Sequence, residues 1–393
     1  MISVEEAEGI IQKHWPNFGE DYLTVESTEG GTLHQPLLGD RDYPPDNRVM
    51  MDGIAVSFET YLSGLREFKV EGVCAAGSPI QTLRDQKNCI EIMTGAVLPE
   101  NTDLIIPYEH IKIENKIATL IQEQKRERFE NIHPRASDFK KGDTILKSGF
   151  ALNGPRWGIA ASLGIERVRI QKKPKITIIS TGDELISVGS EPLPHQVRRS
   201  NAYALKASLL SRGYNGIRLD HVKDEYESLL THYEESANQN EVLIYSGGVS
   251  KGKFDYLPKV WDTMGVTKHF HEVSQRPGKP LWFGVDSKRK VAVIGLPGNP
   301  ISSLVCLHRY FLNEPVKYAR LTDDVHFEKK LSYFVPAQFH HSDDSVTHAK
   351  PLEVKSSGEF SGLAQSDGFI ELPASLSHFK KGESYRIFEW GNR

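Results

Sequence analysis

Cysteine is scarce in this sequence. Only three cysteines occur among 393 residues, Cys74, Cys89 and Cys306, and they do not stand at the spacing of metal ligands. A small, odd and scattered set argues against both a disulfide framework and a cysteine metal site. We therefore expect these residues to be small core side chains in a reducing compartment, the cytoplasm.

An excess of charge of one sign is also missing. Lys and Arg number 48 against 52 Asp and Glu, for a formal net charge of -4 and a pI near 6.4. This balance argues against general nucleic-acid binding, so any anion site must be local. No apolar run approaches the roughly 20 residues that cross a bilayer. The first residues, MISVEEAEGIIQKHW, are acidic where a signal peptide is basic. We expect neither a nucleic-acid nor a membrane partner.

The common nucleotide fingerprints are absent too. The sequence contains no Walker motif, and no G-x-G-x-x-G follows an expected strand. What is present, from about 175 to 315, is an alternation of strand-like and helix-like segments that begins with KITIIS and ends with VAVIG and PISSLVCLHRYFL. Such alternation is typical of a doubly wound, mostly parallel sheet, whose ligands bind beyond the carboxyl ends of its strands.

Three expected strands end in turns of small residues: STGDE at 180–184, SGGVSKGKFD at 246–255 and GLPGNP at 295–300. Small side chains let a ligand approach the backbone, and a following helix presents unpaired N–H groups to an anion. One such turn is compatible with a tight connection, whereas three at one sheet edge indicate a binding site. The candidate binding residues here are Ser180, Thr181, Gly182, Asp183, Ser246, Gly247, Gly248, Ser250, Lys251, Pro297, Gly298 and Asn299.

Cations stand near these turns. Lys251 and Lys253 lie in the second turn, and Arg276 and Lys279 stand three residues apart in the stiff bend RPGKP. Cations held on a stiff bend suit a polyanionic ligand, whereas a solvated surface more often carries them on flexible polar sequence. We therefore interpret Arg276 and Lys279 as ligand-binding residues.

Carboxylates are interleaved with the same turns. Asp183, Glu184 and Asp255 would repel a bound phosphate unless a hard divalent cation lay between, and Mg²⁺ is the usual one. Each of them taken singly is also compatible with a solvated surface. Together they predict a magnesium site beside the anion site.

The whole chain is expected to be a multidomain α/β protein. It combines a doubly wound, mostly parallel sheet domain with a β-rich inserted domain and a small C-terminal all-β domain. The expected divisions are 1–46 with 132–172 as an N-terminal linking domain, 47–131 as the β-rich domain, 173–318 as the α/β domain and 319–393 as the C-terminal β domain.

Two turns in the β-rich segment are dense in small residues. Asp52 and Gly53 precede one apolar run, and Thr94 and Gly95 end another. Both patterns are compatible with ordinary hairpin turns, so the periodicity of the sequence alone does not predict a function for these residues.

Eight motifs resemble, in order, those of the molybdopterin molybdenumtransferase family: DNRVMMDGIA, IMTGAVLP, ASLG, STGDEL, SNAYAL, SGGVSKGKFD, RPGKP and GLPGNPISS. The similarity spans essentially the whole chain, and the ordered set is more specific than any one motif. Members of that family insert molybdate at the dithiolene of adenylylated molybdopterin and release AMP with a divalent metal. The resemblance implies such a transferase here, with 173–318 as the molybdopterin-binding domain and with Mg²⁺, adenylylated molybdopterin and molybdate as its ligands.

The resemblance also implies roles for the carboxylates. Asp183, Glu184 and Asp255 would serve the metal or the adenylate, and Asp255 and Glu184 would act in catalysis. Family members are elongated homodimers whose active site lies between the α/β domain of one subunit and the β-rich domain of the other. Asp52 and Thr94 would accordingly take part in catalysis from the partner subunit.

Other residues carry over from the family with departures. Phosphate or molybdate binding is implied for Arg276, Lys279 and Ser302. The bend begins with Arg276 where relatives usually have Lys, which keeps the charge but changes its geometry. His341, in FHHSDD, is matched to a position where relatives often bring an Arg toward the anion. Asp138 and Asp224 match on fewer neighbouring residues.

Two alternatives remain open at the level of sequence. The α/β domain alone also resembles the molybdopterin adenylyltransferases, which act one step earlier, although the additional N-terminal and C-terminal segments argue against that reading. A non-catalytic scaffold of the same fold is the second alternative, although the site positions keep chemically competent side chains. Release of AMP from adenylylated molybdopterin distinguishes the three activities.

Overall fold

The computed structural model describes residues 1–28, 30–122, 124–249, 256–312, 314–343, 345–354 and 356–391. The chain divides into two compact units: unit 1 comprises Met1–Gly19 and Lys172–Arg393, and unit 2 comprises Glu20–Gln171. Each unit has its own hydrophobic clusters. Ser250, Lys251, Lys253 and Asp255 of the expected second turn lie outside the described residues.

A mixed sheet in the order β16-β13-β17-β21-β20-β18 forms the centre of unit 1. Strands β16, β13, β17 and β21 run parallel, whereas β20 is antiparallel to both of its neighbours. Every residue of β13, β17 and β21 is buried, as expected for strands covered on both faces. The bounds are β13 Ile176–Thr181, β16 Ile217–Val222, β17 Val242–Ser246, β18 Thr267–His271, β20 Trp282–Asp286 and β21 Val291–Leu296.

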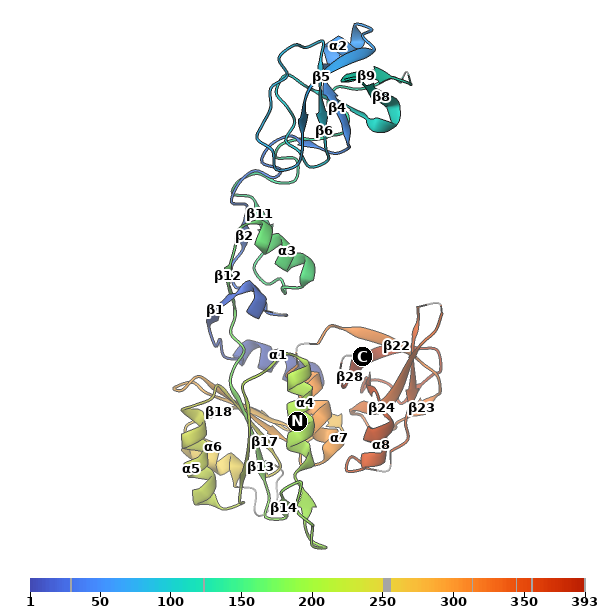
Figure 1. Cartoon of the computed structure of the whole chain (residues 1–393). Coiled ribbons are helices and arrows are strands. Elements are labelled where there is room, and N and C mark those ends of the chain that lie inside the picture. The colour runs from blue at the N-terminus through green and yellow to red at the C-terminus, as the bar shows by residue number, and fades with distance from the viewer. Residues whose placement is uncertain are drawn as a thin grey trace. The chain divides into compact units, whose positions relative to one another are not determined.

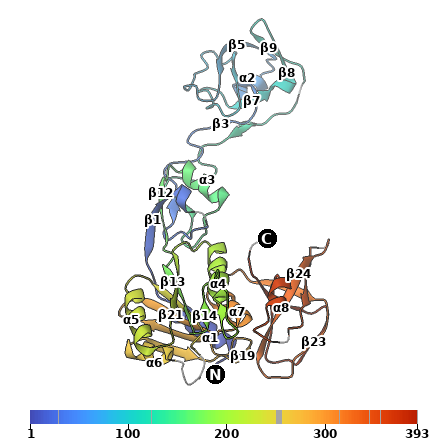
Figure 2. The same cartoon turned by 60° about the horizontal axis from the view of Figure 1, so that its bottom comes forward.

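Helices cover both faces of this sheet (Figures 1 and 2). Because side chains alternate along a strand, Ile178 of β13 packs with α4 and α7, whereas Ile179 packs with α5 and α6. This arrangement confirms the doubly wound sheet expected from the sequence. The helices are α4 Ser200–Ser211, α5 Tyr226–Ala237, α6 Leu257–Thr263 and α7 Pro300–Tyr310; a short ladder joins β14 Leu185–Ile186 to β15 Val197–Arg198.

Helix α1 (Val4–His14) also belongs to the core of unit 1. Ser3 and Glu6 form a capping box that starts the helix, and Val4, Ala7 and Ile11 are buried in the same cluster as α4 and α7. From the sequence, residues 1–46 were predicted to belong to the linking domain instead. The apolar spacing of a helix identifies the face it buries and does not identify the surface that covers this face.

The C-terminal part of unit 1 is a closed β-barrel. Its strands follow the order β24-β25-β22-β28-β26, and β26 pairs again with β24 to close the barrel. Strand β19, which contains Arg276, leaves the α/β part and pairs with the start of β24. The elements are β19 Gln275–Arg276, β22 Lys317–Leu321, β23 Val325–His326, β24 Ser332–His341, β25 Thr347–Pro351, α8 Phe360–Gln365, β26 Gly368–Leu372, β27 His378–Phe379 and β28 Ser384–Glu389.

Unit 2 contains a mixed sheet in the order β7-β4-β6-β5-β9-β8 and three short ladders, β1 with β12, β2 with β11 and β3 with β10. Two apolar clusters pack on this sheet. Its elements are β1 Glu20–Thr24, β2 Leu37–Leu38, β3 Arg48–Val49, β4 Gly53–Val56, α2 Phe58–Leu62, β5 Glu67–Cys74, β6 Cys89–Ile92, β7 Leu104–Pro107, β8 Ile111–Glu114, β9 Ile117–Leu120, β10 Ile132–His133, β11 Thr144–Leu146, α3 Gly154–Ser162 and β12 Arg167–Gln171.

The cysteines lie where the sequence predicted them. Cys74, Cys89 and Cys306 are all buried as free thiols. Burial raises the pKa of each thiol, so the protonated form is favoured. No helix in the described part of the chain combines the length and the apolarity needed to cross a membrane.

Candidate active site

Three neighbouring strands of unit 1 bring the small-residue turns together. Ser180 of β13 pairs with Ser246 of β17, and Ser246 pairs with Leu296 of β21, all in parallel register. The carboxyl ends of these strands therefore meet at one edge of the sheet, as the sequence predicted for the three turns.

Glycine is required at the second turn because the turns touch. Gly247 and Gly248 have φ angles of +101° and +66°, which side chains with a Cβ rarely adopt. A Cβ on Gly247 would lie 3.0 Å from the Thr181 carbonyl oxygen, and one on Gly248 would lie 2.9 Å from Thr181 Oγ1. The backbone of the second turn therefore packs directly on the end of β13.

Asn201 ties the first turn of α4 to the other two strand ends. Its Nδ2 donates to Ser246 Oγ at 3.2 Å and to the Gly298 carbonyl at 2.7 Å. Helix α4 starts at Ser200 with Arg199 as its N-cap, so the Asn201 side chain does not cap the helix. The motif SNAYAL supplied the signal for this residue, yet sequence reasoning assigned it no role in the site.

The acidic residues of the first turn are exposed. Asp183 and Glu184 follow β13, and the Glu184 carboxylate folds back so closely that a Cβ on Gly182 would lie 2.7 Å from either of its oxygens. His221 bonds the Gly182 carbonyl through Nε2 at 3.1 Å. Among the described residues, which omit Asp255, no group of three or more His, Cys, Asp or Glu could hold a metal ion.

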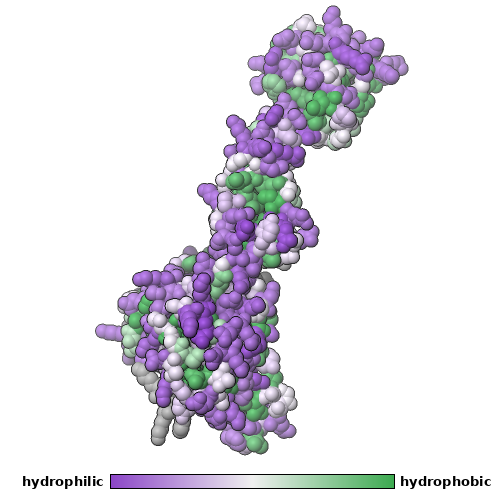
Figure 3. All heavy atoms as spheres, turned by 90° about the vertical axis from the view of Figure 1, so that its left-hand side faces the viewer, coloured by the Kyte–Doolittle hydropathy of each residue, from purple (hydrophilic) through white to green (hydrophobic). Residues whose placement is uncertain are grey.

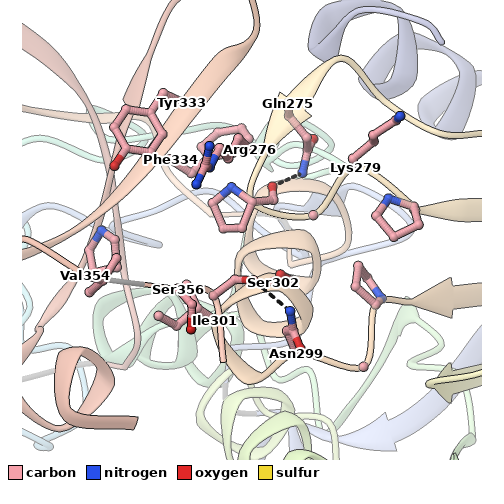
Figure 4. Close-up of a pocket in the computed structure, with 17 residues that line it drawn as sticks. Gln275, Arg276, Lys279, Asn299, Ile301, Ser302, Tyr333, Phe334, Val354 and Ser356 are labelled. Carbon is pink, nitrogen blue, oxygen red and sulfur yellow. Dashed lines mark hydrogen bonds between the residues drawn. The ribbon is translucent and has the colours of Figure 1, made fainter. Parts of the chain in front are cut away.

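Beside this edge, a pocket of about 530 Å³ opens between the bend at 275–280, the start of α7 and the barrel (Figure 4). Its walls combine residues from four separate stretches of the chain. Six candidate binding residues line it: Arg276, Lys279, Pro297, Gly298, Asn299 and Ser302. Residues that sequence reasoning did not assign to the site also line it: Gln275, Tyr333, Phe334, Val354, Ser356 and Ser357.

The bend that carries Arg276 and Lys279 is anchored by a glycine. Gly278 has a φ of +93°, and a Cβ there would lie 2.5 Å from Gln275 Nε2 and 2.6 Å from Cys306 Sγ. Only glycine fits this position without movement of its neighbours. Figure 4 shows the Lys279 side chain pointing away from Ser302, and its ammonium lies 4.0 Å from Glu272 Oε1.

The N-terminus of α7 forms the opposite wall. Asn299 is its N-cap, but the side chain makes no capping bond and instead donates to Ser357 Oγ at 2.8 Å. The Ser357 carbonyl accepts from the Ile301 N–H at 3.2 Å. Ser302 is 3% exposed and lines the pocket in the first turn of the helix, where the helix dipole favours a negative ligand.

Asp52 and Thr94 form a pair in unit 2. Asp52 Oδ1 accepts from the Thr94 N–H at 2.6 Å and from Thr94 Oγ1 at 2.8 Å. These two hydrogen bonds, the backbone bond first, hold the pKa of Asp52 below its ordinary value. Because both residues are exposed, the pair presents an ionised carboxylate at the surface of unit 2.

Three further candidates lie elsewhere. His341 was matched to an anion-binding position, but the residues of β24 that line the pocket are Tyr333, Phe334 and Pro336. At roughly 3.3 Å per residue, His341 stands about 26 Å beyond Tyr333 along the same strand. His341 therefore does not line the pocket of its own chain, and its match to an anion-binding position stays a prediction. Asp138 bonds His133 Nε2 at 2.8 Å, and Asp224 also has an interaction partner.

These features define a class of protein: a multidomain α/β protein with glycine turns at a sheet edge, joined to a closed barrel that completes one wall of the adjacent pocket. Three family descriptions match the chain in succession: the MoeA N-terminal region (domains I and II) at 2–164, a probable molybdopterin binding domain at 177–315 and the MoeA C-terminal region (domain IV) at 318–389.

Individual proteins agree with these matches. A molybdopterin molybdenumtransferase of Synechocystis sp. is 51% identical over 390 residues, which cover 99% of this chain and 100% of the relative. A protein of the same name from Haemophilus influenzae is 28% identical, with 98% of each chain covered. The crystal structure of a molybdopterin biosynthesis MoeA protein from Pyrococcus horikoshii superimposes with a TM-score of 0.83 at 25% identity, covering 100% of both chains. The chain belongs to the molybdopterin molybdenumtransferase family.

Proposed function

We propose that this protein is a molybdopterin molybdenumtransferase, which inserts molybdate into adenylylated molybdopterin, releases AMP and yields the molybdenum cofactor. The observation that carries the proposal is the pocket beside the glycine-lined sheet edge, which is lined by Arg276, Lys279 and the start of α7. The 51% identity to a relative of that name supports it over the whole chain.

Each part of the substrate has a matching part of the site. The pyrophosphate of the adenylate suits the strand ends, where the turns after β13, β17 and β21 meet at one edge of the sheet. Molybdate, a small tetrahedral dianion, suits the pocket, because the described cations that line it are Arg276 and Lys279. A volume of about 530 Å³ leaves room for the dithiolene end of molybdopterin next to the anion.

We include Mg²⁺ in this proposal. Protein sites usually hold Mg²⁺ through one or two carboxylates together with substrate phosphates, and Asp183 and Glu184 are two exposed carboxylates at the strand end where the pyrophosphate would lie. The residues present therefore fit the ion, and Asp255 would be a further ligand. The ion would neutralise charge on the phosphoanhydride as AMP leaves. Asp183 and Glu184 would hold the ion, and the glycines of the turns would keep side chains away from the phosphoanhydride.

We further propose a homodimer in which Asp52 and Thr94 reach the site of the partner chain. Two hydrogen bonds from Thr94 hold the Asp52 carboxylate ionised at the surface of unit 2, which supports a role in a shared site. Next to it, Met50 is 56% exposed and Met51 is 37% exposed. Exposed apolar surface also appears on unit 2 in Figure 3. Such surface beside a polar pair is typical of a binding face.

The experiment mixes the protein with adenylylated molybdopterin, Mg²⁺ and molybdate and follows the release of AMP. A molybdenumtransferase releases AMP and forms active cofactor. An adenylyltransferase would form the adenylate from molybdopterin and leave it intact, and a scaffold would bind it without turnover. The matches that flank 177–315 on both sides favour the first activity.

Buried free cysteines support a reducing, cytoplasmic setting.

A further inference from the structure

Two successive carbonyl groups of the bend at 275–279 point into the protein. The Pro277 carbonyl accepts from Gln275 Nε2 at 3.0 Å, which Figure 4 shows as a dashed line. The Gly278 carbonyl accepts from the Cys306 thiol at 3.6 Å. Both donors are buried, since Gln275 is 1% exposed and Cys306 is 0% exposed. The interior side of the bend is therefore fixed by two side chains from outside the bend's tip.

The geometry of the peptide group then determines where two N–H groups point. In a trans peptide the C=O and the N–H lie in one plane and point in opposite directions. The peptide groups that follow Pro277 and Gly278 are trans, because the cis bonds of the described residues precede Pro44 and Pro277. The N–H groups of Gly278 and Lys279 therefore point away from Gln275 and Cys306.

These two N–H groups belong to residues of the pocket wall. Gly278 and Lys279 both line the pocket, and no described residue accepts a hydrogen bond from either N–H. Gly278 is buried, and a buried N–H group that stays unpaired is costly. Successive N–H groups in a turn with a positive φ form a concave site that binds anions.

The orientation of Gln275 is itself determined. Tyr310, on α7, donates its hydroxyl hydrogen to Gln275 Oε1 in a short hydrogen bond. A flipped amide would place Oε1 against the Pro277 carbonyl, where two acceptors repel. Gln275 Nε2 also approaches Cys306 Sγ at 3.5 Å. Burial raises the pKa of the Cys306 thiol, so it keeps the proton that it donates.

We propose that Gln275 and Cys306 are positioning residues that hold the Gly278 and Lys279 N–H groups toward the pocket as a two-amide nest for a tetrahedral oxyanion. The inference rests on the proposed function, in which that oxyanion is molybdate. The Lys279 side chain points away from Ser302 and toward Glu272, so Lys279 contacts the anion first through its backbone. Rigid amides at fixed positions select a ligand by geometry, which a flexible ammonium does not.

The test measures tungstate binding to the full-length protein by titration calorimetry, with adenylylated molybdopterin binding measured separately. In Gln275→Leu the Pro277 carbonyl loses its donor, and we expect tungstate to bind about tenfold more weakly, since one misdirected hydrogen bond to a charged group costs about that factor. Adenylate affinity should stay within about twofold, because its proposed phosphate contacts lie on the strand ends. The melting temperature checks that each variant folds.

Cys306 provides a matched pair of variants. Cys306→Val removes the donor at nearly constant volume and should weaken tungstate binding several-fold, roughly as one hydrogen bond does. Cys306→Ser keeps a donor and should bind tungstate nearly as the unsubstituted protein does. The control is Cys89→Val, which removes a buried thiol that donates to the Phe68 carbonyl at 3.9 Å in unit 2, and which should leave tungstate affinity unchanged.

A pH profile separates positioning from plain packing. Gln275→Glu can donate to the Pro277 carbonyl only when the introduced carboxyl is protonated. Tungstate affinity of this variant should therefore rise as the pH falls, relative to the unsubstituted protein at each pH. A profile parallel to that of the unsubstituted protein would overturn the positioning role.

Failure of the inference and failure of the proposed function give different results. If the unsubstituted protein releases AMP but Gln275→Leu and Cys306→Val bind tungstate normally, the two-amide nest is wrong and the transferase stands. If tungstate affinity follows the expected order and no AMP is released, the oxyanion nest stands and the transferase assignment is wrong.

Discussion

Glu184 is a described carboxylate whose proposed role in metal binding can be tested directly. We expect Glu184→Gln to lower AMP release about 100-fold or more, because a metal ligand at a phosphoanhydride is worth several kcal/mol in the transition state. Binding of adenylylated molybdopterin should change little, so the loss should fall on turnover. The measurement is AMP release over a range of Mg²⁺ concentrations. The control is Glu191→Gln, which changes an exposed carboxylate in the segment that follows Glu184. Equal activity of the two variants would show that Glu184 is not a metal ligand.

A second prediction about single residues concerns Thr94, whose hydrogen bonds favour the ionised form of Asp52. The two hydrogen bonds from Thr94 lower the pKa of Asp52, so Asp52 stays charged to a lower pH than an ordinary aspartate. Thr94→Val keeps the N–H donor and removes the hydroxyl donor. We therefore expect the pKa of Asp52 to rise toward its ordinary value, measured by NMR titration of the carboxyl carbon. The acid limb of the activity profile should move upward with it, and an unmoved resonance would show that the hydroxyl does not stabilise the charge.

At the scale of elements, a buried ion network joins α1, α7 and the barrel. The Arg309 guanidinium is 3% exposed and bonds Glu8 Oε2 and approaches Glu371 Oε2, each at 3.0 Å. Burial raises the pKa of Glu371 although Arg309 opposes the shift. Glu8, Arg309 and Glu371 thus connect α1, α7 and strand β26 of the barrel.

We expect Glu371→Gln to lower the free energy of unfolding of unit 1 by about 3 kcal/mol, because it leaves a buried guanidinium without one of its counter-charges. Urea unfolding provides the measurement. The Lys317 side chain is 48% exposed and forms an ion pair with Glu389. Lys317→Met removes this exposed pair and should lower the free energy of unfolding by less than about 1 kcal/mol. Similar losses in the two variants would mean that burial does not strengthen the network.

At the scale of the whole molecule, the proposed dimer predicts complementation between subunits. Asp52→Ala and Glu184→Gln should each be inactive alone, because each removes one half of every active site. In random mixed dimers one of the two sites is intact, so mixing equal amounts should restore about a quarter of the unsubstituted activity. AMP release by the equimolar mixture after subunit exchange is the measurement, and mixed dimers purified through two different tags should reach about half of the unsubstituted activity. No recovery in purified mixed dimers would show that Asp52 and Glu184 serve the same subunit.

Much of this protein follows from sequence alone, because the relevant chemistry is local. The buried strands KITIIS and VAVIG alternate with helices, which is sufficient for a doubly wound sheet, and adjacent parallel strands necessarily bring their carboxyl-end turns to one edge. Gly247 and Gly248 were recognisable because positive φ and close backbone approach require glycine at a fixed place in the chain. The cations of the bend RPGKP, Arg276 and Lys279, were also recognisable, because they stand close together in the sequence on a stiff turn.

Tertiary structure alone decided which distant side chains support these local features. Gln275 and Cys306 stand 31 residues apart, and their approach at 3.5 Å depends on how α7 packs under the bend. Asn201 reaches Gly298 over 97 residues. Helix α1 joined the core of unit 1, and Tyr333 of β24 joined the pocket wall, because an apolar face or a strand register has meaning only against the surface that covers it. Local sequence encodes backbone conformation through sterics, whereas partner choice is a property of the complete packed chain.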